Sequence, residues 1–321
     1  MNAPQETFVL PLPNGWFVVD WSHSLGEAEV KAIRCFGRDL VLYRSRSGQP
    51  FLLDAYCPHL GAHLGVGGRV VGDSVRCPFH GWRFDGTGQC VEIPHCKSIP
   101  PNAKLRGWDV VERNGMIFAW HHTEEKPPDW EVPTIEEIGD PDWTEPRRVD
   151  IEVPIHLQEL AENNCDPAHF EFVHGSAELP PSQMELAEDG RFFRMSSPFQ
   201  RETPVGPIEM QLVRDTWGLG LATVRNEGVP GVGLMLFTST TPVEVDRSIM
   251  RWSLSVTRNI ADDYGEEFME RIVEGVHDDI PIWTNKIHRA NPVFCETDKY
   301  IAEFRRWTRQ FYSDPDASGI A

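Results

Sequence analysis

Four residues of this 321-residue chain have types and spacing that suit metal binding. They form the pattern Cys57-x-His59 and then, after seventeen further residues, Cys77-x-x-His80. A structural zinc site with two cysteines and two histidines usually takes its cysteines from one close pair and its histidines from another. Here each half supplies one thiolate and one imidazole, which favours two metal ions rather than a single zinc.

This ligand set predicts a Rieske [2Fe–2S] cluster, in which one iron is bound by two thiolates and the other by two neutral histidines. Glycines around the four ligands would let backbone N–H groups approach the sulfur atoms. His63 is expected to be a loop residue, because four ligands are already present. A cluster of this kind moves one electron and has no open position for oxygen or substrate, so we expect the site that uses the electron elsewhere.

The segment ENNCDPAHFEFVHG, residues 162–175, is a candidate for that second site. Two histidines, His169 and His174, with one distant carboxylate would form the ligand triad of a non-haem Fe(II) oxygenase. Taken alone, the segment is equally consistent with two surface or core histidines. Residues five apart do not share a helix face, so we expect a local distortion such as a π-bulge between them. The carboxylate of Asp166 is expected to orient the His169 ring.

The third ligand has to come from far along the chain. Asp278 and Asp279 are adjacent carboxylates in VHDDIPIWTNK, near the end of an amphipathic helical pattern. For an isolated pair of aspartates, exposed surface charge is the usual explanation. The residues alone therefore leave the third ligand open.

The elements that must position these residues suggest an α+β protein with two domains. Residues 16–122 read as short strands with turns, and 126–146 is a Pro- and acid-rich connection. From 147 a strand leads into a helix, residues 190–258 suggest an antiparallel sheet, and 263–312 show helical spacing. The expected limits are 1–125 for an all-β cluster domain, 126–146 for the linker and 147–321 for the catalytic domain.

Composition excludes several classes of partner. The net charge of −19 argues against nucleic acid or an anionic membrane surface, both of which need a basic patch. No apolar run approaches the roughly 20 residues of a membrane span, and the N-terminal residues do not resemble a secretory signal. Seven cysteines with no regular pattern indicate a reducing compartment, so we expect a cytoplasmic protein.

From about Gly15 to Asp314 the chain resembles the oxygenase component of Rieske non-haem iron oxygenases. The stretches HLQELAENNCDPAHFEFVHG, IPIWTNKIHRANPVF and FRRWTRQFYSD are most similar to the steroid-acting branch, which holds 3-ketosteroid 9α-hydroxylases and cholesterol 7-desaturases. The resemblance implies a helix-grip-like catalytic domain. It also implies Asp279 as the third iron ligand, with Asp278 as the less favoured substitute.

The same resemblance implies partners. These are a flavin and iron–sulfur reductase, with or without a ferredoxin, and O2. It also implies a homotrimer in which Asp166 bridges His80 of a neighbouring subunit to His169. Cholesterol 7-desaturases resemble membrane-anchored enzymes, and this sequence shows no anchor, which favours a bacterial-style hydroxylase.

The expected function is that of a monooxygenase that hydroxylates, demethylates or desaturates an apolar steroid or sterol, in a pocket built on the 200–257 sheet. The segment GVPGVGLMLF, residues 228–237, is either a wall of that pocket or plain sheet core and turn. An oxygenase of aromatic acids or ethers is the alternative, and a Rieske electron carrier without catalysis is a third. Charged aromatic acids need a cation in the pocket, and the sequence marks no obvious one among its candidates: Arg194, Arg201, Arg214, Arg225 and Arg251.

Overall fold

The computed structural model describes residues 10–175, 181–187, 190–201 and 208–314, and for 199–201 and 263–268 the backbone alone. The chain forms two compact units. One consists of Trp16–Thr134, and the other of Ile135 onward together with the residues up to Gly15. The domain limits expected from the sequence, 1–125, 126–146 and 147–321, remain a prediction.

The first unit is built from three small antiparallel sheets, as the alternation of short strands and turns predicted. Two sheets have the orders β1-β11-β10 and β2-β3-β4-β9, and the segment with Cys57 and His59 follows β4. The third sheet, β5-β6-β7-β8, carries Cys77 and His80 between β6 and β7. The strands are β1 (Gly15–Trp21), β2 (Val30–Cys35), β3 (Arg38–Arg44), β4 (Pro50–Asp54), β5 (Arg69–Val71), β6 (Ser74–Arg76), β7 (Arg83–Phe84), β8 (Cys90–Glu92), β9 (Gly107–Trp108), β10 (Val110–Arg113) and β11 (Met116–His121).

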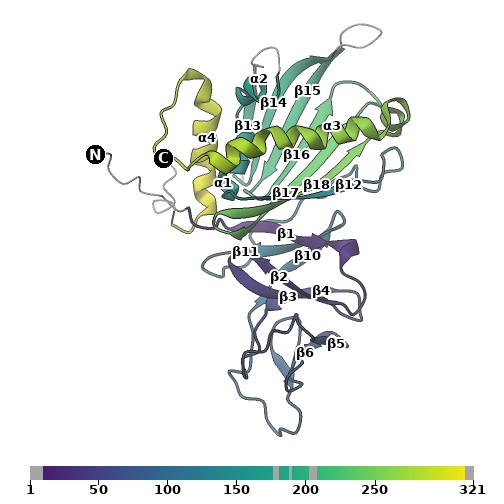
Figure 1. Cartoon of the computed structure of the whole chain (residues 1–321), viewed down its shortest axis with the longest axis vertical. Coiled ribbons are helices and arrows are strands. Elements are labelled where there is room, and N and C mark those ends of the chain that lie inside the picture. The colour runs from purple at the N-terminus through teal and green to yellow at the C-terminus, as the bar shows by residue number, and fades with distance from the viewer. Residues whose placement is uncertain (1–9, 176–180, 188–189, 202–207, 315–321) are drawn as a thin grey trace. The chain divides into compact units, whose positions relative to one another are not determined.

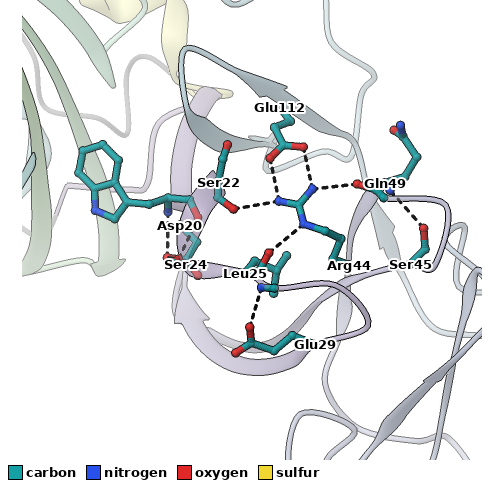
Figure 2. Close-up of polar contacts among 12 residues, drawn as sticks. Asp20, Ser22, Ser24, Leu25, Glu29, Arg44, Ser45, Gln49 and Glu112 are labelled. Carbon is teal, nitrogen blue, oxygen red and sulfur yellow. Dashed lines mark hydrogen bonds and ion pairs between the residues drawn. The ribbon is translucent and has the colours of Figure 1, made fainter. Parts of the chain in front are cut away.

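A single arginine connects two of these sheets (Figure 2). Arg44, the last residue of β3, forms a two-pronged ion pair with Glu112 of β10, with N–O distances of 2.7 and 2.9 Å. Its guanidinium also donates to the carbonyls of Ser22 and Leu25 at 3.0 and 2.9 Å. The hydrogen bonds between the two side chains raise the pKa of Arg44 and lower that of Glu112. A planar guanidinium group that makes several hydrogen bonds fixes geometry better than an isolated ion pair. This contact therefore fixes the positions of the two sheets relative to each other.

The second unit contains a seven-stranded antiparallel sheet in the order β12-β18-β17-β16-β15-β14-β13. Apart from β12, which returns to pair with β18, neighbours in the sheet are neighbours in sequence. The strands are β12 (Arg147–Val153), β13 (Gln183–Leu186), β14 (Phe192–Arg201), β15 (Ile208–Trp217), β16 (Leu221–Glu227), β17 (Leu234–Glu244) and β18 (Arg247–Val256).

Helices surround this sheet: α1 (Leu157–Asn163), α2 (His169–Phe172), α3 (Arg258–Asn285) and α4 (Lys299–Thr308). The long helix α3 runs across one face of the sheet (Figure 1). Its buried Val276 and Trp283 share one apolar core with Leu236, Met250 and other sheet residues. The expected α+β class is confirmed, with an all-β N-terminal unit and a helix-grip-like sheet unit.

The C-terminal helix is tied to α1 by buried polar contacts. Arg305 of α4 donates two hydrogen bonds of 2.9 Å to the carboxylate of Glu162 in α1, and both side chains are buried. Gln158 donates to the same carboxylate at 2.9 Å and accepts from Tyr312 at 3.1 Å. Because α1 ends at Asn163, this network fixes the helix end that reaches the candidate metal site.

The buried histidine at the N-terminus of α1 should make the stability of the protein depend on pH. His156 caps the helix through Nδ1, which accepts from the Gln158 N–H at 3.0 Å, while Nε2 lies 3.2 Å from the Pro11 carbonyl. Burial lowers the pKa of His156 to about 4. As the pH falls, His156 is protonated in the unfolded chain before it is protonated in the folded chain. The free energy of unfolding therefore falls between about pH 6.5 and pH 4, by up to about 3 kcal/mol.

We expect His156→Asn, which keeps a helix-capping oxygen, to show a smaller drop in unfolding temperature between pH 7 and pH 4.5 than the unmodified protein. Differential scanning calorimetry at the two pH values measures this. His277 is exposed, so His277→Asn serves as the control and should show the same drop in unfolding temperature as the unmodified protein. An equal drop in all three proteins contradicts the role of His156.

Candidate metal centres and substrate cavity

The two predicted cluster loops have the same backbone design. In each loop the cysteine N–H donates to the carbonyl five residues later, and the cysteine carbonyl accepts from the glycine N–H four residues later, at 2.8 to 3.2 Å. The glycines are Gly61 after Cys57 and Gly81 after Cys77, with φ of 74° and 76°. Side chains other than glycine rarely adopt this left-handed conformation, so both glycines are required for the turns.

The four side chains of these loops are arranged in two layers. Cys57 and Cys77 are each 3% exposed, whereas His59 and His80 lie at the surface with ring centres 4.6 Å apart. Burial raises the pKa of Cys57 to about 11, so a bound cation is needed to hold a thiolate there. Two buried sulfur ligands and two exposed imidazoles fit one inner and one outer iron.

The second candidate site brings together residues from two distant parts of the chain. Ligand atoms of His169, His174 and Asp279 all lie within 4.8 Å of one another. The two imidazole ring centres are 5.2 Å apart, and His174 Nε2 lies 3.4 Å from Asp279 Oδ2. Two imidazoles and one carboxylate are the donor set of mononuclear non-haem iron.

The two candidate aspartates differ in where they lie. Asp279 is 6% exposed, whereas Asp278 is exposed and its carboxylate reaches only to 4.0 Å from His174 Nδ1. Burial raises the pKa of Asp279, while His174 and His169 act in the opposite direction. Burial also lowers the pKa of His169, which favours the neutral imidazole that a metal binds.

The expected distortion between the two histidines was wrong. Helix α2 keeps ordinary hydrogen bonds, from Val173 N to His169 O at 2.7 Å and from His174 N to Phe170 O at 3.2 Å. The helix ends at Phe172, and His174 lies two residues beyond its end, although its N–H still bonds to Phe170 O. The two rings come together at this single helical turn without a π-bulge.

The expected contact between the Asp166 carboxylate and the His169 ring was also wrong. Instead, His169 Nδ1 lies 2.5 Å from the Asp166 backbone carbonyl, which accepts its proton and leaves Nε2 for a metal. The Asp166 carboxylate accepts from the backbone N–H groups of Ala168 and His169, at 2.9 and 3.3 Å. It therefore holds the start of α2, while the backbone orients the ring.

Sequence reasoning missed Asn163, which lies between the predicted ligands. Its Nδ2 lies 3.3 Å from His169 Nε2 and 3.4 Å from Asp279 Oδ1. Asn163 belongs to the same ENNC segment as the histidines, but its position at the end of α1, facing α3, has no signature in the sequence.

A cavity of about 400 Å3 adjoins this triad, and it is lined by residues of the seven-stranded sheet together with residues of α1, α2 and α3. This confirms the expected location on residues 200–257. From the segment 228–237, all of it described, Leu236 lines the cavity, and its glycine-rich part forms the turn between β16 and β17. The volume lies in the range of about 300–1,000 Å3 that is typical of small-molecule sites.

Among the five arginines considered as pocket cations, Arg214 lines this cavity. Arg194 and Arg225 instead pair with Asp215, at 2.6 and 3.6 Å, and Arg251 lies 3.6 Å from Asp150. The side chain of Arg201 lies outside the described residues. The cavity therefore holds a cation that the sequence did not distinguish from its neighbours.

Comparison with known families identifies a domain in each part of the chain. Residues 15–106 match the model of the Rieske [2Fe–2S] domain, and residues 119–312 match that of the 3-ketosteroid 9α-hydroxylase C-terminal domain. Together these domains define a Rieske oxygenase, so the protein is an oxidoreductase, and the first domain carries a [2Fe–2S] cluster.

Relatives specify the branch. A cholesterol 7-desaturase of Ciona intestinalis is 32% identical over 325 residues, covering 94% of this chain and 69% of the relative. The oxygenase component of the 3-ketosteroid-9-alpha-monooxygenase of Rhodococcus rhodochrous is 29% identical, covering 94% and 82%. The chain belongs to the Rieske oxygenase family that contains the 3-ketosteroid 9α-hydroxylases and cholesterol 7-desaturases.

Solved structures share the fold at lower identity. Pseudomonas putida NdmA with caffeine matches with a TM-score of 0.76 at 21% identity, covering 95% of this chain and 93% of NdmA. Dicamba monooxygenase bound to dicamba matches with a TM-score of 0.73 at 20% identity, covering 93% and 97%. Among the described residues of the present chain, no helix has the length and apolar character needed to cross a membrane.

Proposed function

We propose that this chain is the oxygenase component of a monooxygenase that oxidises a steroid or sterol. The observation that carries the proposal is a set of two histidines and one carboxylate that line a largely apolar cavity, in a chain that also has a Rieske domain. A Rieske electron carrier without catalysis needs neither the triad nor the cavity.

In the proposed site, His169, His174 and Asp279 hold Fe(II), and Cys57, His59, Cys77 and His80 hold the [2Fe–2S] cluster. Three protein ligands leave positions open on the iron, which supplies activation of O2 when bound. The carbonyl of Asp166 fixes the His169 ring so that Nε2 points at the metal. The Asn163 amide donates to Asp279 Oδ1 and so holds the carboxylate in place. Apolar walls exclude water from the substrate.

The partners follow from the class of enzyme. An oxygenase component takes its electrons from a separate reductase and reacts with O2 and a small substrate. The finer details are proposals: a flavin and iron–sulfur reductase, with or without a ferredoxin, and a homotrimer. We also propose a cytoplasmic location, because none of the seven cysteines forms a disulfide, as in a reducing compartment.

In the proposed trimer, Asp166 bridges His80 of a neighbouring subunit to His169: its carboxylate faces His80, and its backbone carbonyl accepts from His169 Nδ1. Asp166→Asn keeps an oxygen that accepts from the N–H groups of Ala168 and His169, so we expect both metals to stay bound. Without the negative charge, oxidation of the reduced cluster by O2 in the presence of substrate should slow by about 10-fold or more, comparable to other losses around metal ligands. Stopped-flow absorbance of the cluster measures this rate, with Asp278→Asn as the control. An unchanged rate contradicts the bridge.

The substrate class is tested by product analysis. The purified protein, with both metals and a surrogate reductase, is incubated with NADH, O2 and a panel of sterols, 3-ketosteroids and aromatic acids. Mass spectrometry should find a steroid or sterol product that has gained an oxygen atom or lost two hydrogens. Oxidation of aromatic acids alone contradicts the proposal.

One observation favours a second candidate, an oxygenase of aromatic acids. That function needs a cation in the cavity, and Arg214 supplies one. The family and the relatives favour the steroid, so this candidate stays second.

A further inference from the structure

The cavity is lined by a buried arginine that forms no ion pair with the described residues and leaves two of its nitrogen atoms without a hydrogen bond. Arg214, in the middle of β15, is 3% exposed and lines the cavity. Its Nη2 donates to Ser197 Oγ at 2.7 Å, whereas Nε and Nη1 have no hydrogen-bond partner among the described residues. No carboxylate of the described residues lies within ion-pair distance of it. Burial lowers its pKa, with Cys165 and Asp166 acting in the opposite direction.

The neighbouring strand positions show why this charge is unusual. Asp215 points to the opposite face of the sheet, as successive strand residues do, and there it pairs with Arg194 and Arg225. The sheet thus provides a carboxylate for the arginines on that face and none for Arg214. Buried charges are normally paired, because an isolated ion loses its hydration without compensation.

Two more unsatisfied polar groups line the same cavity. Thr216 Oγ1 lies two residues along β15, on the same face as Arg214, and Trp252 Nε1 is on β18. Both are buried, and neither has a partner among the described residues. A largely apolar cavity that is lined by a few polar residues is the usual form of a small-molecule site. Two of these three groups can only donate, so the missing ligand group is an acceptor.

We infer that the substrate is a steroid carrying a carboxylate, and that Arg214 pairs with this carboxylate. This inference rests on the proposed function and narrows it. A carboxylate oxygen accepts from one of the free donors of the guanidinium, Nε or Nη1, and neutralises its charge, which a neutral ketone does not. The remaining walls, such as Leu212, Leu221, Leu236 and Met250, suit the apolar ring system.

The position of Arg214 also limits which carbon is oxidised. Its guanidinium lies 5.5 Å from the centre of the Phe170 ring, and that ring lies 4.3 Å from the ring of His169. Arg214 therefore lies near the candidate iron ligands. The oxidised carbon should lie in the part of the steroid next to the acid group rather than at its far end.

Equilibrium binding to the resting enzyme, with both metals and without reductant, tests the inference. Isothermal titration calorimetry compares 3-oxochol-4-en-24-oic acid with its methyl ester, which has the same skeleton and no charge. We expect the acid to bind roughly 30-fold or more tightly than the ester, as for other desolvated charge pairs. In Arg214→Gln this preference should fall to within about 3-fold while the affinity for the ester is kept. Arg247→Gln, which changes a partly exposed arginine of β18 that does not line the cavity, should behave as the unmodified protein.

The outcomes separate this inference from the proposed function. Equal binding of acid and ester by the unmodified protein overturns the inference, whatever the variants do, even if neutral steroids are oxidised. Tight binding of 2-methoxybenzoic acid with no binding of either steroid overturns both the inference and the steroid function. If Arg214→Gln keeps its cluster absorbance and its circular dichroism yet retains the full preference, Arg214 is not the group that pairs with the acid.

Discussion

Replacing His169 with alanine should abolish turnover while leaving the Rieske cluster intact. His169 is one of three side chains that form the candidate iron site, and it is separated from the cluster ligands by almost ninety residues of sequence. Loss of one of three protein ligands leaves too few to hold the ion against water. Iron analysis should fall from about three to about two atoms per chain, since the cluster holds two and the triad one. Product formation should fall to the level of the reductase alone.

An EPR measurement and a control variant distinguish loss of the iron ligand from general misfolding of the protein. The EPR signal of the reduced cluster should be unchanged in His169→Ala, because the cluster ligands are not altered. His277→Ala, which removes an exposed imidazole from α3, should keep three irons and full turnover. Loss of the cluster signal together with turnover in His169→Ala argues against two separate metal sites. Three irons retained in that variant exclude His169 as a ligand.

The cluster and the fold were predictable because their determinants are local. Each cluster loop places its cysteine and histidine within four residues, and a glycine turn repeats in both loops. Alternation of apolar residues marks the strands, and helical spacing marks α3 and α4. The histidines His169 and His174 are likewise near each other in sequence, and even their unexpected backbone, a helix of one turn, did not change which side chains converge.

The remaining parts of the site depend on how distant segments pack. Asp279 lies more than a hundred residues after His169, and the family resemblance, rather than spacing, separated it from Asp278. Arg214 and Asp215 show the limit clearly. Alternation places them on opposite faces of β15, but it does not say which face becomes the cavity. Only the structure shows that Asp215 pairs with its neighbours while Arg214 lines the cavity.

Replacing Arg305 with methionine should destabilise the second unit strongly. Arg305 and Glu162 are both buried and joined by two hydrogen bonds of 2.9 Å. The variant leaves the Glu162 carboxylate buried without its cation, which costs roughly 3–5 kcal/mol of unfolding free energy. Urea unfolding followed by tryptophan fluorescence should show a clearly lower midpoint. Because the pair fixes the end of α1 that carries Asn163, the variant should also lose its mononuclear iron more readily on dialysis against a chelator.

The adjacent residue in the same helix provides the matched control. Arg306 is largely exposed and pairs only with Glu303 among the described residues, at 3.4 Å, so Arg306→Met should change stability by less than about 1 kcal/mol. The double variant Glu162→Gln with Arg305→Met should recover part of the lost stability, since a neutral amide replaces the stranded charge. If the double variant is as unstable as Arg305→Met alone, the loss comes from packing of the arginine side chain and not from the buried carboxylate. In that case the ion pair is not what holds α4 against α1.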